Sequence, residues 1–349
     1  MIRSMNCAFG ILAALTIVGC SSGGKDSGGS GGADGTTNTG CTVDFETYPA
    51  SGATDWYFQS PVEAVLSEAD ATATITLSGP DGDVAGSVSI VDDTRVIFTP
   101  DADLSPSTEY SMSVSLCDGS SGSSITFSTS ELGLPVECDL TGKSYRVDLL
   151  SARFIQPDPS IASLLFEQLS DDILLGVSDM GESELSMLGA LSNGTGGQQN
   201  YCYPSIDFPT AATFSDPVFS VGPADTTLEV AGEPITISNL SISGAFAPDC
   251  TYFGGGKLQG ELDARLLAPL VADLIGEDDP TEICNFLVTF GVTCAECSSD
   301  GQPFCADVEV DQIAASSTGV ALSCVSEEEC HPACSTSTCD DPNAGDCNL

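Results

Sequence analysis

Cysteines and carboxylates are the groups in this 349-residue chain whose types and numbers could do chemistry. Cys294-Ala-Glu-Cys297 has the C-x-x-C spacing of a redox disulfide or of half a zinc site. A redox site of that kind needs a βαβ context and a helix N-terminus that lowers the thiol pKa, and the surrounding sequence shows neither. The one histidine, His331, lies beside Pro332 in a cysteine-rich segment, which argues against a Ser-His-Asp triad. We therefore expect structural disulfides here, and no catalytic or cofactor-binding residue.

Carboxylates dominate the charge of the chain, with 51 Asp and Glu against 8 Lys and Arg and a net charge of −43. Among so many, a pair such as Asp171/Asp172 cannot indicate general acid–base catalysis. Calcium at one or more turns is an alternative to a solvated acidic surface, although the run from Asp341 to Asp346 only approaches the spacing of a calcium loop. The charge excludes nucleic acid as a direct partner, because phosphates would be repelled.

The N-terminus has the order of an export signal. Arg3 supplies a positive start, and the apolar stretch over 8–18 is too short to span a bilayer. Ile17-Val18-Gly19-Cys20 resembles the lipobox of bacterial lipoproteins, which implies that residues 1–19 are removed as a signal peptide. The resemblance also implies that the Cys20 thiol carries a diacylglycerol and that the mature N-terminus is acylated, for example with palmitate.

A flexible tether follows the lipidated cysteine. Residues 21–40 are almost wholly Gly, Ser, Thr, Asn and Asp, which cannot pack into a core. Twenty such residues have a mean reach of roughly 25 Å. Ser21, in a position where Asp resembles an inner-membrane retention signal, favours the outer membrane. We expect a lipid-anchored protein of the bacterial cell envelope, facing the periplasm or the outside.

Export makes disulfides the expected state of the other cysteines. Cys7 lies in the signal and Cys20 carries lipid, which leaves fourteen of the sixteen, and their spacing does not determine the pairing. The candidates are Cys41, Cys117, Cys138, Cys202, Cys250, Cys284, Cys294, Cys297, Cys305, Cys324, Cys330, Cys334, Cys339 and Cys347.

Short alternating segments separated by turns predict a β-sandwich over residues 41–131. In the segment 109–116, for example, Tyr110, Met112, Val114 and Leu116 fall on one face. The other predicted strands are 71–77, 84–91, 95–98 and 124–127.

Three motifs in this region resemble bacterial Ig-like domains of the SbsA type: Val96-Ile-Phe-Thr-Pro100, the run from Leu104 to Tyr110, and Ile125-Thr-Phe-Ser-Thr129. The resemblance covers about a quarter of the chain and implies a spacer or binding module on a bacterial surface. It names no partner. Cys41 and Cys117 depart from the family pattern and could join the first segment to the penultimate strand.

Residues 138–323 resemble no family, and their pattern predicts a second, β-rich (α+β) domain held by disulfides. Asp158-Pro159 and Asp279-Pro280 each offer a helix N-cap followed by proline, and a third apolar stripe covers 266–275. These stripes are typical of a core, with the lining of a lipid cavity as the alternative. The predicted strands are 143–154, 173–178, 184–190, 213–221, 234–246 and 256–263.

The end of the chain, residues 324–349, is an acidic, cysteine-rich tail with almost no large apolar residue. We expect it to combine with Cys294, Cys297 and Cys305 into a disulfide-held cap or tail. The whole chain is thus predicted to be mainly β: an Ig-like sandwich, a β-rich domain with a few helices, and this tail.

Three functions are compatible with this organisation. The first is a membrane-anchored, non-enzymatic binding, adhesion or scaffold module with an unidentified protein or glycan partner. The second is a carrier whose 138–323 domain holds a hydrophobic ligand beneath the stripe helices. The third is an extracellular hydrolase that uses a carboxylate pair. The sequence favours the first, with no resident cofactor.

Overall fold

The computed structural model describes most of the chain from Cys41 onward, and these residues belong to one compact unit. The predicted signal, Cys20 and tether lie outside the described residues, as do the helix predicted after Asp158 and most of the tail with His331. The described residues are 41–156, 171–194, 197–201, 203–208, 210–230, 233–268, 276, 279–289 and 291–325.

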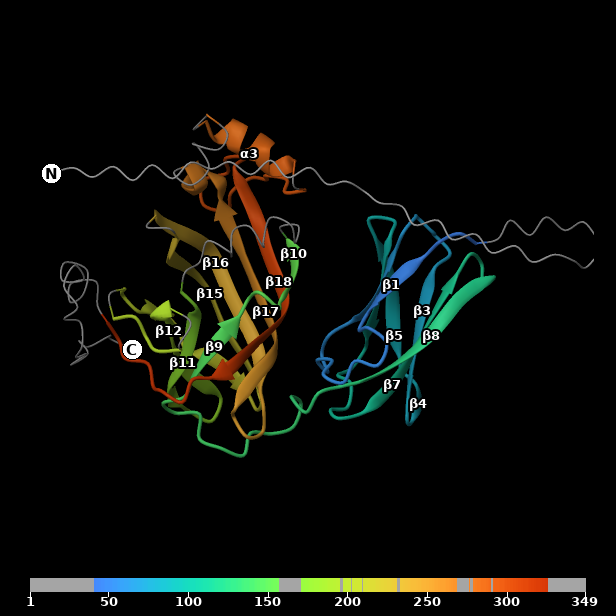
Figure 1. Cartoon of the computed structure of the whole chain (residues 1–349), viewed down its shortest axis with the longest axis horizontal. Helices are drawn as coiled ribbons and strands as arrows, with labels where there is room; N and C mark the ends of the chain where they lie inside the picture. Colours follow the sequence, from blue (N-terminus) through green and yellow to red (C-terminus); the bar gives the residue numbers. More distant parts are fainter. Residues whose placement is uncertain are drawn as a thin grey trace, which may run out of the picture. The chain divides into compact units, whose positions relative to one another are not determined.

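Residues 41–130 form two antiparallel sheets that face each other, which we call the N-terminal sandwich (Figure 1). The strand orders are β1-β2-β6-β5 and β4-β3-β7-β8. The strands are β1 (Phe45–Tyr48), β2 (Val62–Leu66), β3 (Thr74–Gly79), β4 (Gly82–Asp83), β5 (Gly86–Val91), β6 (Arg95–Pro100), β7 (Glu109–Leu116) and β8 (Ser121–Ser128).

The sandwich core follows from alternation along its strands. In β7 the four apolar residues predicted for one face are all buried, from Tyr110 to Leu116, and the residues between them are exposed or half-buried. Trp56, the sole tryptophan of the chain, packs edge-on against Phe127 with ring centroids 6.4 Å apart. The predicted β-sandwich is confirmed.

The second part of the chain folds into one sheet of ten antiparallel strands. Its strands are β9 (Ser144–Asp148), β10 (Arg153–Gln156), β11 (Ile173–Met180), β12 (Glu184–Leu191), β13 (Ile206–Asp207), β14 (Ala212–Ser215), β15 (Val218–Val230), β16 (Glu233–Phe246), β17 (Tyr252–Asp263) and β18 (Cys305–Ser317). We call residues 144–317 the closed sheet.

The sheet closes because its first and last strands pair. β9 pairs with β18, from Tyr145↔Ser317 to Asp148↔Ala314, and β9 also pairs with β11 (Figure 1). Eight of the ten strands complete the ring, since β10 and β13 only add to one neighbour each. Such a ring leaves no free edge, and at eight strands its interior is just wide enough for side chains or one small ligand.

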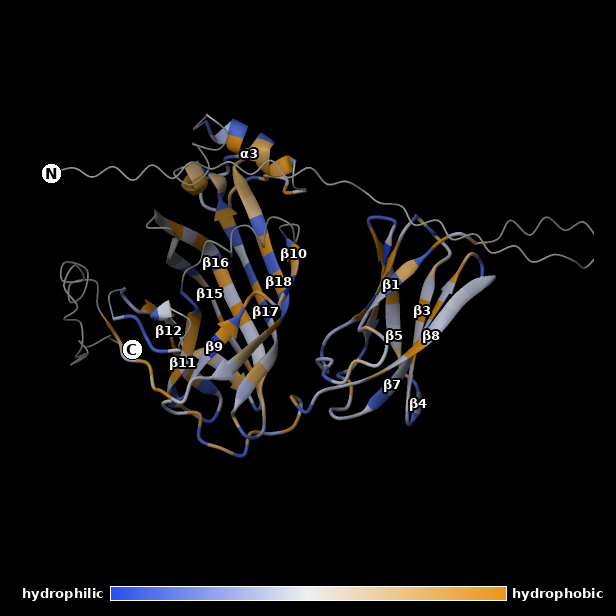
Figure 2. Cartoon of the chain, in the orientation of Figure 1, coloured by the Kyte–Doolittle hydropathy of each residue, from blue (hydrophilic) through white to orange (hydrophobic). Residues whose placement is uncertain are grey.

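Some predicted strands differ from the structure in their limits, and one strand was not predicted. The segment predicted as one strand over 213–221 is divided into β14 and the start of β15. The segment predicted as one strand over 143–154 is broken into β9 and β10, because the Asp148 side chain accepts a hydrogen bond from Ser151 N (3.2 Å) and turns the chain. β18 was not predicted as a strand. Its inward residues change from even to odd numbers at Gln312, whose φ is +56°, so no continuous alternation marks it. Figure 2 shows both hydrophobic and hydrophilic colours along this strand.

The helix α3 (Pro280–Val288) begins as the sequence predicts. Asp279 is its N-cap and accepts a hydrogen bond from Thr281 N (2.8 Å), and Pro280 occupies the first turn. The helix predicted over 266–275 is represented by a 3₁₀ turn, η2 (Ala264–Leu267), beyond which most residues lie outside the described part. Among the described residues, no helix has the length and apolar character needed to cross a membrane.

An ion-pair network joins the sandwich to the closed sheet. Glu63, only 3 % exposed, accepts hydrogen bonds from Arg95 in the same sandwich (2.7 Å) and from Arg153 of β10 (2.8 Å). Burial alone would raise the pKa of Glu63, but the two guanidinium groups outweigh it and lower the pKa.

The Tyr57 ring lies where a side chain on Gly255 would project, so this position requires glycine.

Candidate functional site

Four aromatic rings close one end of the interior of the closed sheet. Tyr145, Phe219, Phe246 and Phe253 are each fully buried, and their ring centroids lie 4.7 to 5.9 Å apart. We call this group the aromatic floor. The Tyr145 hydroxyl donates to the carbonyl of Cys250 (3.3 Å), and burial raises the pKa of Tyr145 above its usual value. The floor is a packed apolar plug, since aromatic pairs at these distances attract one another.

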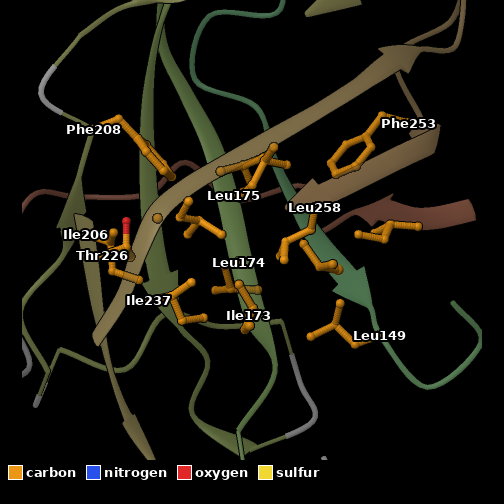
Figure 3. Close-up of a pocket in the computed structure, with 15 residues that line it drawn as sticks. Leu149, Ile173, Leu174, Leu175, Ile206, Phe208, Thr226, Ile237, Phe253 and Leu258 are labelled. Carbon is orange, nitrogen blue, oxygen red and sulfur yellow. The ribbon is translucent and has the colours of Figure 1, made fainter. Parts of the chain in front are cut away.

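An apolar cavity adjoins the aromatic floor inside the closed sheet (Figure 3). Its lining comes from strands around the ring, including Val147 of β9, Leu174 of β11, Ile242 of β16 and Leu258 of β17. Of the fifteen residues that line it, Thr226 is the one with a polar side chain. The cavity has a volume of about 50 Å³. The surface exposed inside it is wholly apolar, and the Thr226 hydroxyl is buried behind that surface.

The burial of the lining residues gives the cavity a deep part and a mouth. Leu175, which packs in the same core cluster as the floor, is buried, and so is Phe253 of the floor itself. Ile206, Ile237 and Leu258 are half-buried although they line the same cavity. Large aliphatic side chains that stay partly exposed inside a closed sheet indicate a part accessible to solvent, where apolar surface can still be removed from water.

A pair of irregularities decides which residues of β15 face this cavity. Phe219 and Val221 point inward, and regular alternation would next turn Pro223 and Asp225 inward. Instead the pairing shifts by one residue between Val221↔Ile242 and Ala224↔Leu240, at Gly222. Gly222 has a φ of +90°, and a side chain there would collide with the Leu240 carbonyl.

The partner strand β16 contains the compensating irregularity at Asn239, whose φ is +53°. The Asp225 carboxylate stays outside and accepts a hydrogen bond from Asn239 N (3.0 Å), which ties the two irregularities together. The register then returns at Thr226↔Ile237. The result is that Thr226, and not Asp225, faces the apolar interior.

The Thr226 side chain carries the orphaned polar atom of this cavity. The residue is 4 % exposed, and its hydroxyl oxygen is buried without a hydrogen-bond partner. Burying a hydroxyl without a partner costs about 1–3 kcal/mol.

The sequence favoured a core role for the apolar stripes, with a ligand-lining role as the alternative, and the core role is confirmed for the described residues. Ile283 and Leu287 of α3 pack against Ala264 and Leu267 in a separate core cluster, and none of them lines the cavity. The stripe of α3 is core, as its helical spacing favours. The lining comes from strands, whose inward residues could not be identified before the register shifts were known.

The C-x-x-C motif is split between two disulfides. Cys294 is bonded to Cys284 and Cys297 to Cys305, so the two motif cysteines do not pair with each other. The expectation of structural disulfides is confirmed. Three of these cysteines were expected to hold the tail. That expectation is wrong, because Cys294 is bonded to Cys284 of α3 and Cys297 is bonded to Cys305 at the start of β18.

One group of possible metal ligands occurs among the described residues: Asp263, Cys297 and Cys305. The two cysteines are bonded to each other, and Asp263 accepts hydrogen bonds from the Arg265 guanidinium (2.6 Å). Thiolates are therefore not available and the carboxylate is already neutralised. The geometry does not fit a zinc or calcium site.

Two further disulfides close long loops. Cys41 is bonded to Cys117, just after β7, as the sequence allowed, and Cys138 is bonded to Cys250 beside the aromatic floor. Cys324 is also in a disulfide. The remaining candidates lie outside the described residues: Cys202, Cys330, Cys334, Cys339 and Cys347.

Residues 37–129 match the family model of the bacterial Ig-like domain. This part of the chain is a bacterial Ig-like domain. The match agrees with the two facing sheets and with the motifs between Val96 and Thr129, and we use this name for the N-terminal sandwich from here on. An Ig-like domain of this kind fits a non-enzymatic surface or adhesion module of the cell envelope.

Two other comparisons add little. The solved structure of surface layer protein SbsC, domains 1–6, is similar at 10 % identity and a TM-score of 0.22, over 80 % of this chain and 53 % of that chain. The chain thus spans about half the length of that structure, and so low a score carries no conclusion about the fold. A search of curated proteins found no match. The closed sheet stays without a family.

Proposed function

We propose that the protein is a lipid-anchored, non-enzymatic binding module of the bacterial cell envelope whose closed sheet holds an apolar ligand. The Ig-like domain serves as spacer and contact surface between the membrane tether and this sheet. Anchoring rests on Cys20 and its lipobox-like sequence. The hydrolase alternative receives no support from the family match or from the cavity, whose lining contains no charged group.

The apolar cavity carries this proposal. A packed core buries its large aliphatic residues completely, whereas Ile206, Ile237 and Leu258 line a cavity and stay half-buried. Small-molecule sites are typically concave and apolar, with few polar groups that fix the orientation of the ligand. The cavity shares the apolar surface of such sites at a smaller volume of about 50 Å³, and it is enclosed by strands that are paired around a ring. These observations favour a carrier of a hydrophobic ligand within the surface module.

Methyl NMR of the Cys20→Ala form tests the proposal without detergent. We expect 1-hexanol to shift the methyl signals of Leu174, Ile237 and Leu258 in a saturable way, because these side chains line the cavity. The methyl signals of Val96 and Leu116, buried in the Ig-like domain, are the internal control and should stay unchanged. Absence of saturable shifts at the lining residues, or equal shifts in both groups, would contradict the proposal.

A further inference from the structure

We infer that a polar cleft between the Ig-like domain and the outer face of the closed sheet binds a neutral sugar, with Gln312 and Lys257 in contact with its hydroxyl groups. This site is separate from the apolar cavity, so the inference goes beyond the proposed function and does not depend on it. The cleft has a volume of about 510 Å³. Sites for small molecules have volumes of roughly 300–1,000 Å³ and lie preferentially at domain interfaces. The cleft therefore has the size and the place of such a site.

The two walls of the cleft are fixed to each other by packing and by charge. Leu132, just after the Ig-like domain, and Ala245 of β16 belong to the same hydrophobic cluster as the core of the Ig-like domain. The Arg153 guanidinium lies 4.8 Å from the centroid of the Tyr48 ring, in addition to its ion pair with Glu63. The cleft is thus formed before a ligand arrives, which lowers the cost of binding.

Strand pairing places a polar row on the outer face of the closed sheet. Ser220 of β15 pairs with Ser243 of β16, and Ser243 pairs with Lys257 of β17. Their neighbours Val221 and Ile242 face the interior, and alternation therefore turns the row outward. All three residues of the row line the cleft.

A bulge in β18 adds a glutamine to this wall. The register shift between β17 and β18 inserts one extra residue between Val310 and Ile313. These two residues are buried, so both residues between them, Asp311 and Gln312, face the cleft. Bulges re-aim side chains in this way beside functional sites. Gln312 is half-buried, and its amide makes no hydrogen bond within the described part of the chain, so its donor and acceptor atoms stay accessible in the cleft.

The charges that line the cleft cancel. Three of the eight basic residues of the chain and three carboxylates line it: Arg95, Arg153, Lys257, Glu63, Glu309 and Asp311. Each basic side chain is paired, for example Lys257 with Glu309 (2.9 Å) and Arg153 with Asp311 (3.2 Å). An ionic ligand would have to break a pair and leave one partner without a counter-charge, which disfavours anions and cations alike. A neutral hydroxyl hydrogen-bonds to these charged groups without breaking a pair, and such bonds are stronger than those between neutral groups.

The cleft also has an apolar part, which favours a sugar among neutral polar molecules. Ile97, Ile155 and Val218 line it and are half-buried. A sugar ring carries C–H groups on its faces and hydroxyls around its edge, so it covers these side chains while its hydroxyls reach Gln312 and Lys257. Each hydroxyl both donates and accepts, as the amide of Gln312 does. A wholly apolar ligand would instead remove these polar groups from water without giving them a partner.

Methyl NMR of the Cys20→Ala form with glucose, galactose and mannose tests the inference. We expect at least one of these sugars to shift the methyl signals of Ile97 and Ile155 in a saturable way, because both residues line the cleft. Ile283 in the core beside α3 and Leu258 in the apolar cavity should not respond. The uronate and the 2-amino analogue of the tightest sugar should bind more weakly. Absence of saturable shifts with all three sugars, or equally tight binding of a charged analogue, would overturn the neutral-sugar site and leave the apolar cavity unaffected.

Two variants test the assigned contacts. Gln312 has a φ of +56°, which glycine adopts readily, so Gln312→Gly removes the amide without straining the backbone. We expect this variant to bind the sugar about 3- to 10-fold more weakly, the loss of one or two hydrogen bonds. Unchanged affinity would overturn the role of Gln312.

Lys257→Ala leaves the cleft with two basic residues against three carboxylates, so it should weaken binding of the neutral sugar and favour the 2-amino analogue relative to it. Lys143→Ala is the matched control, because it removes the same charge from a residue that does not line the cleft, and it should leave both affinities unchanged. The same change of preference in both lysine variants would overturn the contact assigned to Lys257.

Discussion

The Cys41→Ala/Cys117→Ala double variant is expected to lower the free energy of unfolding of the Ig-like domain by about 4.5 kcal/mol. The bond closes a loop of 76 residues, and a crosslink over so long a loop removes much of the entropy of the unfolded chain. It also fixes the segment before β1 to the end of β7. Denaturant unfolding followed by Trp56 fluorescence measures the effect in this domain, because Trp56 is the sole tryptophan and packs in its core.

The Cys297→Ala/Cys305→Ala variant is the matched control for this experiment. It removes a bond that closes a separation of 8 residues in the closed sheet, for which the same relation gives only about 2.5 kcal/mol. Because the change lies outside the Ig-like domain, the Trp56 transition should stay where it is. A Trp56 transition that moves as much in the control as in the Cys41/Cys117 variant would contradict this account of the disulfide.

The Cys20→Ala substitution is expected to move the protein completely from the membrane fraction to the soluble fraction. Each buried methylene of an acyl chain contributes about 0.8 kcal/mol, and stable attachment needs two or more chains. Cell fractionation and blotting measure the distribution.

The other cysteine of the N-terminal segment provides the control. Cys7 precedes the lipobox-like sequence, so Cys7→Ala should leave the protein in the membrane fraction. Retention of Cys20→Ala in the membrane would refute lipid anchoring at this residue. Release of both variants into the soluble fraction would contradict a specific role of Cys20, because Cys7 lies outside the lipobox-like sequence.

The sequence predicts correctly those elements whose structure depends on interactions between residues close together in the chain. The residues Tyr110 to Leu116 alternate without interruption, and β7 has the predicted limits. Asp279-Pro280 predicts the start of α3 because a capping carboxylate and a proline act within a single turn. The Cys41–Cys117 bond could be proposed because both residues flank predicted strands of one sandwich.

The closure of the sheet could not be predicted in the same way. It depends on β9 pairing with β18, strands more than 160 residues apart, and no local pattern encodes such a pairing. The strand predicted to end at residue 221 continues to Val230, because Gly222-Pro223 forms an irregularity within β15 and not a turn after it. A dipeptide that usually ends a strand was thus a misleading signal.

The candidate site could not be predicted from the sequence either, because the register of paired strands is not encoded in a local pattern. Side chains alternate between the two faces of a strand, so the odd or even position of a residue decides whether it faces the interior. A single extra residue exchanges the two faces for the rest of the strand. Asp225 and Thr226 exchange their expected places through the shift at Gly222. Isoleucine and leucine residues in a strand have the same pattern whether they fill a packed core or line a cavity. The sequence therefore indicated only the apolar stripes of the helices as alternative lining residues.

Native mass spectrometry of the Cys20→Ala form, exported by a bacterium and purified without detergent, tests the central claim most directly. We predict a neutral mass in addition to the polypeptide, which dissociates on activation and is identified as an apolar small molecule. Leu258→Phe, which fills the cavity from a half-buried position, should remove this mass. Gln259→Phe adds the same ring at the neighbouring exposed position and should keep it. A bare polypeptide mass in the parent, or a bound mass that survives Leu258→Phe, would contradict the claim that the closed sheet holds the ligand.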